Sequence, residues 1–186
     1  MSLWHNFWGH LHTILRHKNM VRRNCFRAGL YWQGISHDWS KYHPVEFWNG
    51  VKYYQAGKRS PNHAEKEDKG YTSAWLHHKG RNRHHYEYWI DIPVDSSLGQ
   101  QGMRMPDRYI VEMFCDRMAA SKNYNAQNYD DSFPLAYYEK NKGHYLMHPH
   151  TKELLEKLLH MLAEEGEDKT FAYIRTELDL KHSPRW

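Results

Sequence analysis

The sequence predicts an all-α protein that folds as a single-domain helical bundle over residues 1–186. Three observations favour this class. Apolar residues recur at helical spacing in most segments, no segment shows the alternation of a half-buried strand, and no internal repeat is present. The 186 residues are 40% hydrophobic and 26% charged, which suffices for one domain with its own core and excludes wholesale disorder.

The N-terminal quarter of the chain predicts three helices. The first helical segment covers residues 3–33, as one long helix or two abutting ones, and Gly34 ends it. Ser36 fits the N-cap of a short helix that carries residues 37–41. A proline fits the first turn of the next helix, over residues 45–54.

A polar segment rich in helix breakers follows. It predicts a surface loop over residues 56–70, with a short helix at 64–69. A helix then covers residues 71–79, and Gly80 ends it. Another helix is expected over residues 82–90, with its first residue, an asparagine, as the cap.

The remaining chain predicts a further helix of the core and a C-terminal group of helices. Residues 91–105 are expected to be irregular, a helix is expected over 107–122, and a polar loop over 123–134. Three helices follow, over residues 133–142, 151–165 and 169–180. The leucine-rich segment 151–165 is the clearest amphipathic helix, and Gly166 ends it. We expect residues 10–125 to hold the chemistry and residues 133–180 to support it.

Charge and cysteine usage narrow the classes of function. The net charge of +4 is too mild to imply nucleic-acid binding by itself. The only cysteines, Cys25 and Cys115, exclude a disulfide framework and fit small core residues. No apolar run approaches the roughly 18 residues of a membrane helix, and the first eight residues do not resemble a secretory signal. We therefore expect a cytoplasmic protein without a membrane partner.

The chain is unusually rich in histidine, with 16 residues. Histidine ligates metals as the neutral imidazole. Four clusters stand out in predicted helices or at their ends, and they are His37-Asp38, His77-His78, His84-His85 and Asp116. An adjacent His-Asp pair suits a metal, because the imidazole supplies a directional nitrogen and the carboxylate can bridge two ions. A His-Asp pair by itself is more often a surface dipeptide, so the surrounding residues decide whether this pair is a candidate for metal binding.

Two further positions join these clusters through helical spacing. Asp116 shares the inward face of its predicted helix, and a buried carboxylate needs a metal or a cationic partner such as Arg117. His17 lies at the edge of the apolar face of the first helix, as does His10. We prefer His17 as a ligand because the 20 residues that separate it from His37 allow the chain to return along a helix.

The double histidines lie on either side of a glycine in the segment HHKGRNRHH. They are expected to line the mouth of one turn. Which member of each pair points inward stays open. The alternative is a basic surface turn that touches phosphate or nucleic acid.

Together these residues resemble the HD-domain superfamily of metal-dependent phosphohydrolases. HDWSK resembles the superfamily's HD-x-[GS]-K signature, and HHKGRNRHHYEYW and MPDRYIVEMFCDRMAA are similar to an uncharacterised bacterial and phage branch of it. The resemblance implies an HD-like helical fold and a first ion held by His17, His37, Asp38 and Asp116. It implies a second ion, with Asp38 bridging, for which His78, His84 and His85 are the candidates. Lys41 matches a lysine that contacts a substrate phosphate or orients the site. The histidine pairs lie closer together than in many binuclear relatives.

These observations favour hydrolysis of a phosphate ester, with a nucleotide as the expected substrate. One or two divalent ions would activate water, and zinc, manganese, iron and magnesium all remain open. Lys41, Arg81 and Arg83 could neutralise phosphate charge, and Asp38 or Glu87 could accept a proton.

Two alternatives remain. An HD-type di-iron oxygenase would use the same residues. A non-enzymatic protein with a structural metal would bind nucleic acid or a partner through interleaved basic and aromatic residues, which are Lys52, Tyr53, Tyr54, Lys58 and Arg59.

Overall fold

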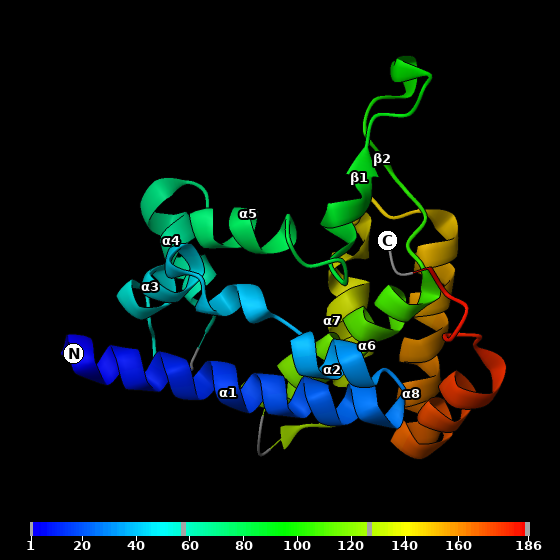
Figure 1. The fold of residues 1–186 in the computed structure, drawn as a ribbon, viewed down its shortest axis with the longest axis horizontal. Helices are drawn as coiled ribbons and strands as arrows, with labels where there is room; N and C mark the ends of the chain where they lie inside the picture. The colour runs from blue at the N-terminus through cyan, green and yellow to red at the C-terminus, as the bar shows by residue number, and fades with distance from the viewer. Residues whose placement is uncertain (1, 57–58, 126–127, 185–186) are drawn as a thin grey trace.

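The computed structural model describes residues 2–56, 59–125 and 128–184. Within these residues the fold is all-α, as predicted, with one small sheet (Figure 1). The helices are α1 (Leu3–Arg27), α2 (Tyr31–Ser36), α3 (Pro44–Lys52), α4 (Pro61–Lys69), α5 (Ser73–Lys79), α6 (Asp107–Asn125), α7 (Phe133–Asn141) and α8 (Pro149–Glu177). Two short antiparallel strands, β1 (Ile90–Asp91) and β2 (Gln101–Gly102), pair with each other. No helix in the described part of the chain is long and apolar enough to cross a membrane.

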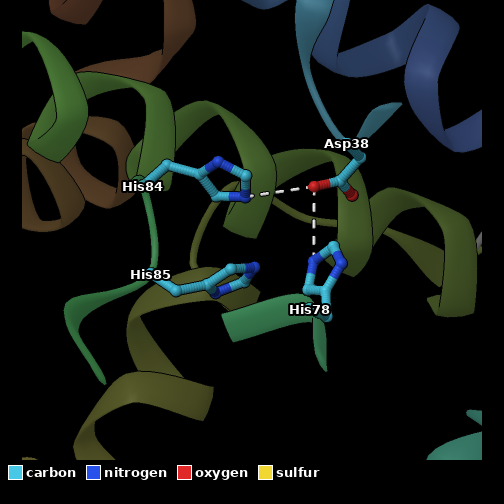
Figure 2. A group of neighbouring side chains, drawn as sticks. All are labelled: Asp38, His78, His84 and His85. Carbon is cyan, nitrogen blue, oxygen red and sulfur yellow. Dashed lines mark ion pairs between the residues drawn. The ribbon is translucent and has the colours of Figure 1, made fainter. Parts of the chain in front are cut away.

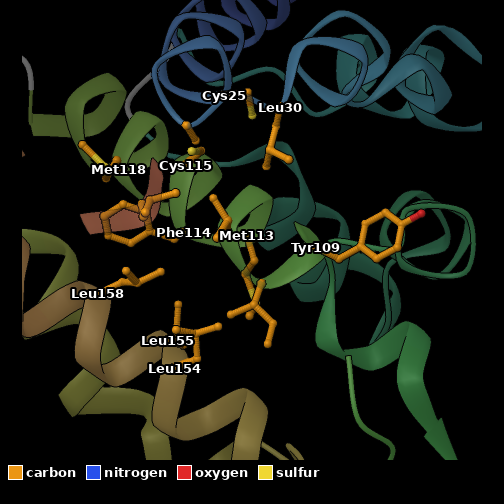
Figure 3. Packing of buried hydrophobic residues seen from close by; sticks show 14 of the residues in the cluster. Cys25, Leu30, Tyr109, Met113, Phe114, Cys115, Met118, Leu154, Leu155 and Leu158 are labelled. Atoms are coloured by element: carbon orange, nitrogen blue, oxygen red, sulfur yellow. The ribbon is translucent and has the colours of Figure 1, made fainter. Parts of the chain in front are cut away.

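The hydrophobic core lies where α6 packs between α1 and α8 (Figures 1 and 3). Each of these helices buries one apolar stripe, and the stripes meet through residues such as Val21, Phe114 and Leu158, which are fully buried. Cys25 and Cys115 are free and buried in this core, as the sequence predicted. On the other half of α1, helices α3, α4 and α5 form a second group. Helices α1 and α6 pack against each other where the core and this second group meet.

The first predicted segment is two helices rather than one. Helix α1 ends at Arg27, and Gly29 turns the chain with a φ of 79° before α2 begins. Gly34 does not end a helix but lies within α2. A Cβ atom there would stand 3.0 Å from Cβ of Cys25, so the glycine lets α2 approach α1 closely. Ser36 donates its hydroxyl to the Trp32 carbonyl instead of capping the next helix.

One further prediction is wrong, and two others need only new bounds. The short helix predicted at 64–69 is present but begins earlier, as α4 (Pro61–Lys69). The helix expected over residues 82–90 is wrong, because the chain forms turns there and only a 3-10 turn at Tyr86–Trp89. The last two predicted helices are present within α8, and Gly166, with φ 80° and ψ 175°, breaks the helical geometry where the sequence placed a helix end.

Candidate metal centre

Five segments meet between the two groups of helices and bring the predicted ligands together. Helix α1 supplies His17, and the end of α2 leads into His37 and Asp38. Helix α5 supplies His78, the turn after it supplies His84 and His85, and α6 supplies Asp116. These are all the ligands that the resemblance implied. Their donor atoms fall into two groups, and Glu112 forms a third with His37 and His84.

Asp38 turns into the centre because its backbone is unusual. It adopts a φ of 53°, in the left-handed region, and precedes the 3-10 turn Trp39–Tyr42. Aspartate tolerates this region better than most residues, although the conformation still costs about 1–3 kcal/mol. The strain places the Asp38 carboxylate at the meeting point of α1, α5 and α6. Its side chain is 1% exposed.

The first group consists of His17, His37 and Asp116. The Nε2 atom of His17 lies 2.8 Å from Oδ1 of Asp116, and the Nε2 atom of His37 lies 3.8 Å from the same oxygen. The Oδ2 atom of Asp38 lies 3.3 Å from His37 Nε2, so its carboxylate borders this group.

The second group consists of Asp38, His78, His84 and His85 (Figure 2). Oδ1 of Asp38 lies 3.3 Å from Nε2 of His78 and 3.3 Å from Nε2 of His84. The donor atoms of all four residues lie within 4.8 Å of one another. One oxygen of Asp38 therefore faces each group, which is the arrangement of a carboxylate that can bridge two ions.

The separations fit the coordination sphere of a divalent ion. Two donors bound at about 2.1 Å stand roughly 3.0–3.4 Å apart when the bond angle is about 90–109°. The three contacts of Asp38 with the imidazoles match this range at 3.3 Å. The Nε2 atoms of His17, His37, His84 and His85 and both oxygens of Asp38 are buried and, among the described residues, lack a hydrogen bond of good geometry apart from ion pairs such as His17–Asp116 and Asp38–Lys41. Buried polar atoms normally have partners, so these clusters could hold a metal ion.

Two carboxylates orient the imidazoles from outside. Oε1 of Glu112 lies 3.0 Å from Nδ1 of His37 and 3.2 Å from Nδ1 of His84. Glu46 faces Nδ1 of His77 at 2.6 Å and Nδ1 of His78 at 2.7 Å. A carboxylate at Nδ1 holds the proton there and leaves the Nε2 lone pair free for an ion.

Charge within the centre is balanced between acids and imidazoles. Burial opposes ionisation of Asp38, but the neighbouring His37 and Lys41 charges hold its pKa well below the usual range. The pKa of Asp116 is also well below its usual value, because the hydrogen bond from His17 outweighs burial. Burial and the charges of His84 and His78 hold the pKa of His85 well below its usual value. The carboxylates around them outweigh burial and raise the pKa of His37, His78 and His84, so a bound ion would have to displace protons from these imidazoles.

A pocket of about 250 Å³ opens beside the centre. His17, Asp116, His78 and His85 line its inner end together with Lys41. Other lining residues supply apolar and aromatic side chains and the start of α4, and they include Ile14, Tyr54, Arg59, Ser60, Asn62 and Trp75. A small molecule in this pocket would contact both groups of metal-ligating residues.

Three of the predicted functional residues lie elsewhere. Arg81 is exposed and donates to the His77 carbonyl, and Arg83 donates to the Tyr109 hydroxyl. Neither arginine lines the pocket. Glu87 also lies outside the pocket lining, and burial raises the pKa of its carboxyl group. Among the predicted phosphate-binding and catalytic side chains, Lys41 and Asp38 remain at the centre.

Two of the residues in the nucleic-acid hypothesis are paired with acids. Tyr53 donates its hydroxyl to Asp68, and Arg59 forms two hydrogen bonds with Glu67. Lys52 contacts the Tyr53 hydroxyl and ring. Lys58 lies outside the described residues.

Sequence reasoning missed the two orienting glutamates. Glu46 lies in the first turn of α3, a position where solvent-exposed acids are common. The neighbouring sequence therefore did not indicate that its side chain is buried. Glu112 lies four residues before Asp116, which puts both on one face of α6. That spacing was a usable signal, because a second acid on the inward face of a helix needs partners as much as the first.

One of three comparisons with known proteins found a match. A family described as a family of unknown function, DUF5662, matches residues 6–161, and these residues include every member of the two groups. A search of curated proteins found no match, and a search of solved structures found none either. Since the match covers well over half of the chain, the protein belongs to the DUF5662 family.

Proposed function

We propose that this protein is a metal-dependent phosphohydrolase that holds two divalent ions and hydrolyses a small phosphate ester, with nucleotides as the first substrates to test. One observation carries the proposal. The two oxygens of Asp38 face different groups of imidazoles, with His37 on one side and His78 and His84 on the other, each at 3.3 Å. Two ions that share a carboxylate form a clamp on both the attacking and the leaving oxygen of a phosphoryl group.

The resemblance to the HD-domain superfamily supports the same proposal. The residues that the resemblance assigns to the first ion come from α1, the turn after α2, and α6. His17 and His37 lie around Asp116, and Asp38 contacts His37. Those assigned to the second ion surround the other oxygen of Asp38. We therefore propose that the DUF5662 family is an HD-like family.

The side chains of this chain have separate roles in the proposed reaction. Bound ions would lower the pKa of water and polarise the phosphoryl oxygen. Lys41 lies 2.6 Å from Oδ2 of Asp38 and lines the pocket, so its ammonium group can neutralise phosphate charge next to the ions. Of the two predicted proton acceptors, Glu87 lies outside the pocket lining, and Asp38 has one oxygen facing each ion site, so we assign Asp38 to the ions rather than to proton transfer.

The test is phosphate release by protein loaded separately with Mn²⁺, Fe²⁺, Zn²⁺ and Mg²⁺. Substrates are nucleoside mono-, di- and triphosphates and an aryl phosphate. We expect release with at least one ion and a loss of at least about 100-fold in Asp38→Asn. His160→Asn is the matched control, because His160 is exposed and pairs only with Glu164 among the described residues. No release with any ion, or equal activity in Asp38→Asn, would reject the proposal.

A di-iron oxygenase is the second candidate, because the donors are imidazoles and carboxylates without a thiolate. Such donors suit non-haem iron. Tyr54 and Trp75 add aromatic surface to the pocket wall, which an apolar substrate could contact. Iron-loaded protein that changes its visible absorbance on exposure to oxygen, and that releases no phosphate, would favour this function.

A further inference from the structure

Glu112 belongs to neither group of predicted ligands, and its carboxylate contacts the Nδ1 atom of one histidine in each. Its Oε1 atom lies 3.0 Å from Nδ1 of His37 and 3.2 Å from Nδ1 of His84. His37 faces Asp38 Oδ2 with its Nε2 atom, and His84 faces Asp38 Oδ1. A single oxygen atom behind the centre thus orients one imidazole on each side of Asp38.

The position of Glu112 is fixed by a buried chain of hydrogen bonds. Gln33 donates from Nε2 to Glu112 Oε2 at 2.9 Å, and its Oε1 accepts from Arg108 Nε at 2.9 Å. The Arg108 main chain in turn donates to the hydroxyl of Ser183 near the C-terminus. Gln33, Arg108 and Glu112 are each 5–7% exposed. Buried polar networks that are fully hydrogen-bonded hold their members rigidly, so Glu112 has little freedom to shift.

Glu46 contacts fewer of the candidate ligands than Glu112 does. Its two oxygens bond Nδ1 of His77 and of His78, and only His78 belongs to a metal-ligating group. His77 instead stacks on His43 with ring centroids 4.3 Å apart. Glu46 therefore supports one side of the centre, whereas Glu112 supports both.

We propose that Glu112 is a shared positioning residue, which fixes the tautomer of His37 and His84 and so sets the affinity of both ion sites at once. The inference rests on the two-ion centre of the proposed function, but not on the reaction. A carboxylate that accepts the Nδ1 proton increases the basicity of Nε2, and loss of such a partner typically lowers metal affinity about 10- to 100-fold. Substitution of this one residue acts on two sites because both imidazoles share its Oε1 atom.

Stepwise binding of Mn²⁺ and Co²⁺ to metal-stripped protein, by calorimetry and chelator competition, tests the proposal. We expect two ions in the wild type, both bound about 10- to 100-fold more weakly in Glu112→Gln. The matched variant Glu46→Gln should weaken one ion only. The d–d spectrum of bound Co²⁺ reports the ligand geometry of each site. A loss of protein stability alone would not change this spectrum.

A second variant keeps the test open if Glu112→Gln does not fold. Gln33→Met removes the donor to Glu112 Oε2 and keeps both histidine contacts, so both ions should weaken by a smaller factor than in Glu112→Gln. Wild-type affinity for both ions in the Glu112 or Gln33 variant, or the loss of one ion only, would overturn the proposal. So would a wild type that binds neither ion. Normal ion binding without phosphate release would instead reject the phosphohydrolase and leave the role of Glu112 standing.

Discussion

The ammonium nitrogen of Lys41 lies 2.6 Å from Oδ2 of Asp38, three residues earlier in the chain. The left-handed backbone of Asp38 and the 3-10 turn that follows bring both side chains to the same side. Lys41 also lines the pocket, and its side chain is 30% exposed. The pair therefore places a cation between a carboxylate of the metal centre and the space for a substrate.

Lys41→Met should reduce catalysis without removing metal. Lysine carries three donors and no acceptor, so it does not ligate the ions, and its loss removes charge from the phosphate side of the centre. We expect kcat/KM to fall about 100-fold with unchanged metal content. The measurement is phosphate release beside elemental analysis, with the exposed Lys66→Met as control. Loss of metal in Lys41→Met, or full activity, would contradict this role.

Single histidine variants should remove one ion each. His17→Ala takes away a ligand of the first group, and His85→Ala takes away a ligand of the second, whereas Asp38→Ala affects both. We therefore expect about one ion per chain in each histidine variant and almost none in Asp38→Ala. Elemental analysis after dialysis measures this, with His160→Ala as the surface control. Equal metal content in all variants would contradict the two-site arrangement.

The sequence predicted which inner residues of the candidate centre lie together better than it predicted the residues that support them. The adjacency of His37 and Asp38, and the inward face that holds Asp116, are local features, and local spacing is what a sequence reveals directly. Glu46 and His78 come from different helices, so their contact depends on how α3 packs on α5. Packing between two helices leaves no periodic pattern in the sequence from which such a contact could be predicted.

The same limit explains the errors in the turns. Arg81 and Arg83 are close to His84 in sequence, which suggested a shared site, but the turn after α5 directs them to His77 and Tyr109. A turn changes direction at each residue, so neighbours in sequence need not share a face. By contrast, α6 and α8 were predicted well, because long amphipathic segments carry their own burial pattern.

Glu65→Gln should destabilise the fold in a pH-dependent way. Glu65 is 1% exposed and joins α4 to the start of α5, because Oε1 accepts from the Ser73 main chain at 3.1 Å and from Lys69 at 3.1 Å. Burial alone would raise the pKa of Glu65, but hydrogen bonds from Ser73, Thr72 and Lys69 lower it from 4.5 to about 2. The ionised form is therefore the one that stabilises the folded state.

The sign of the effect follows from the lowered pKa. Its contribution is fully present above pH 4.5 and is lost as the pH falls toward 2. We expect Glu65→Gln to lower the free energy of unfolding by about 2 kcal/mol at pH 7, and by less at pH 3.5. Urea unfolding at the two pH values measures the difference, with the exposed Glu153→Gln as control. A difference that is constant or larger at pH 3.5 would show that the Glu65 charge does not stabilise the fold.

Gly102→Ala should destabilise the protein through a main-chain clash. A Cβ atom at Gly102 would stand 2.6 Å from the main-chain nitrogen of His148 and 2.7 Å from the carbonyl oxygen of Leu146. Main chain cannot move aside as a flexible side chain can, so β2 or the start of α8 must shift, which typically costs about 1–3 kcal/mol. Gly143→Ala is the matched control, because a Cβ atom there meets nothing within 4 Å. Urea unfolding of both variants compares the costs, and equal stability of the two would show that the chain around residue 102 yields without strain.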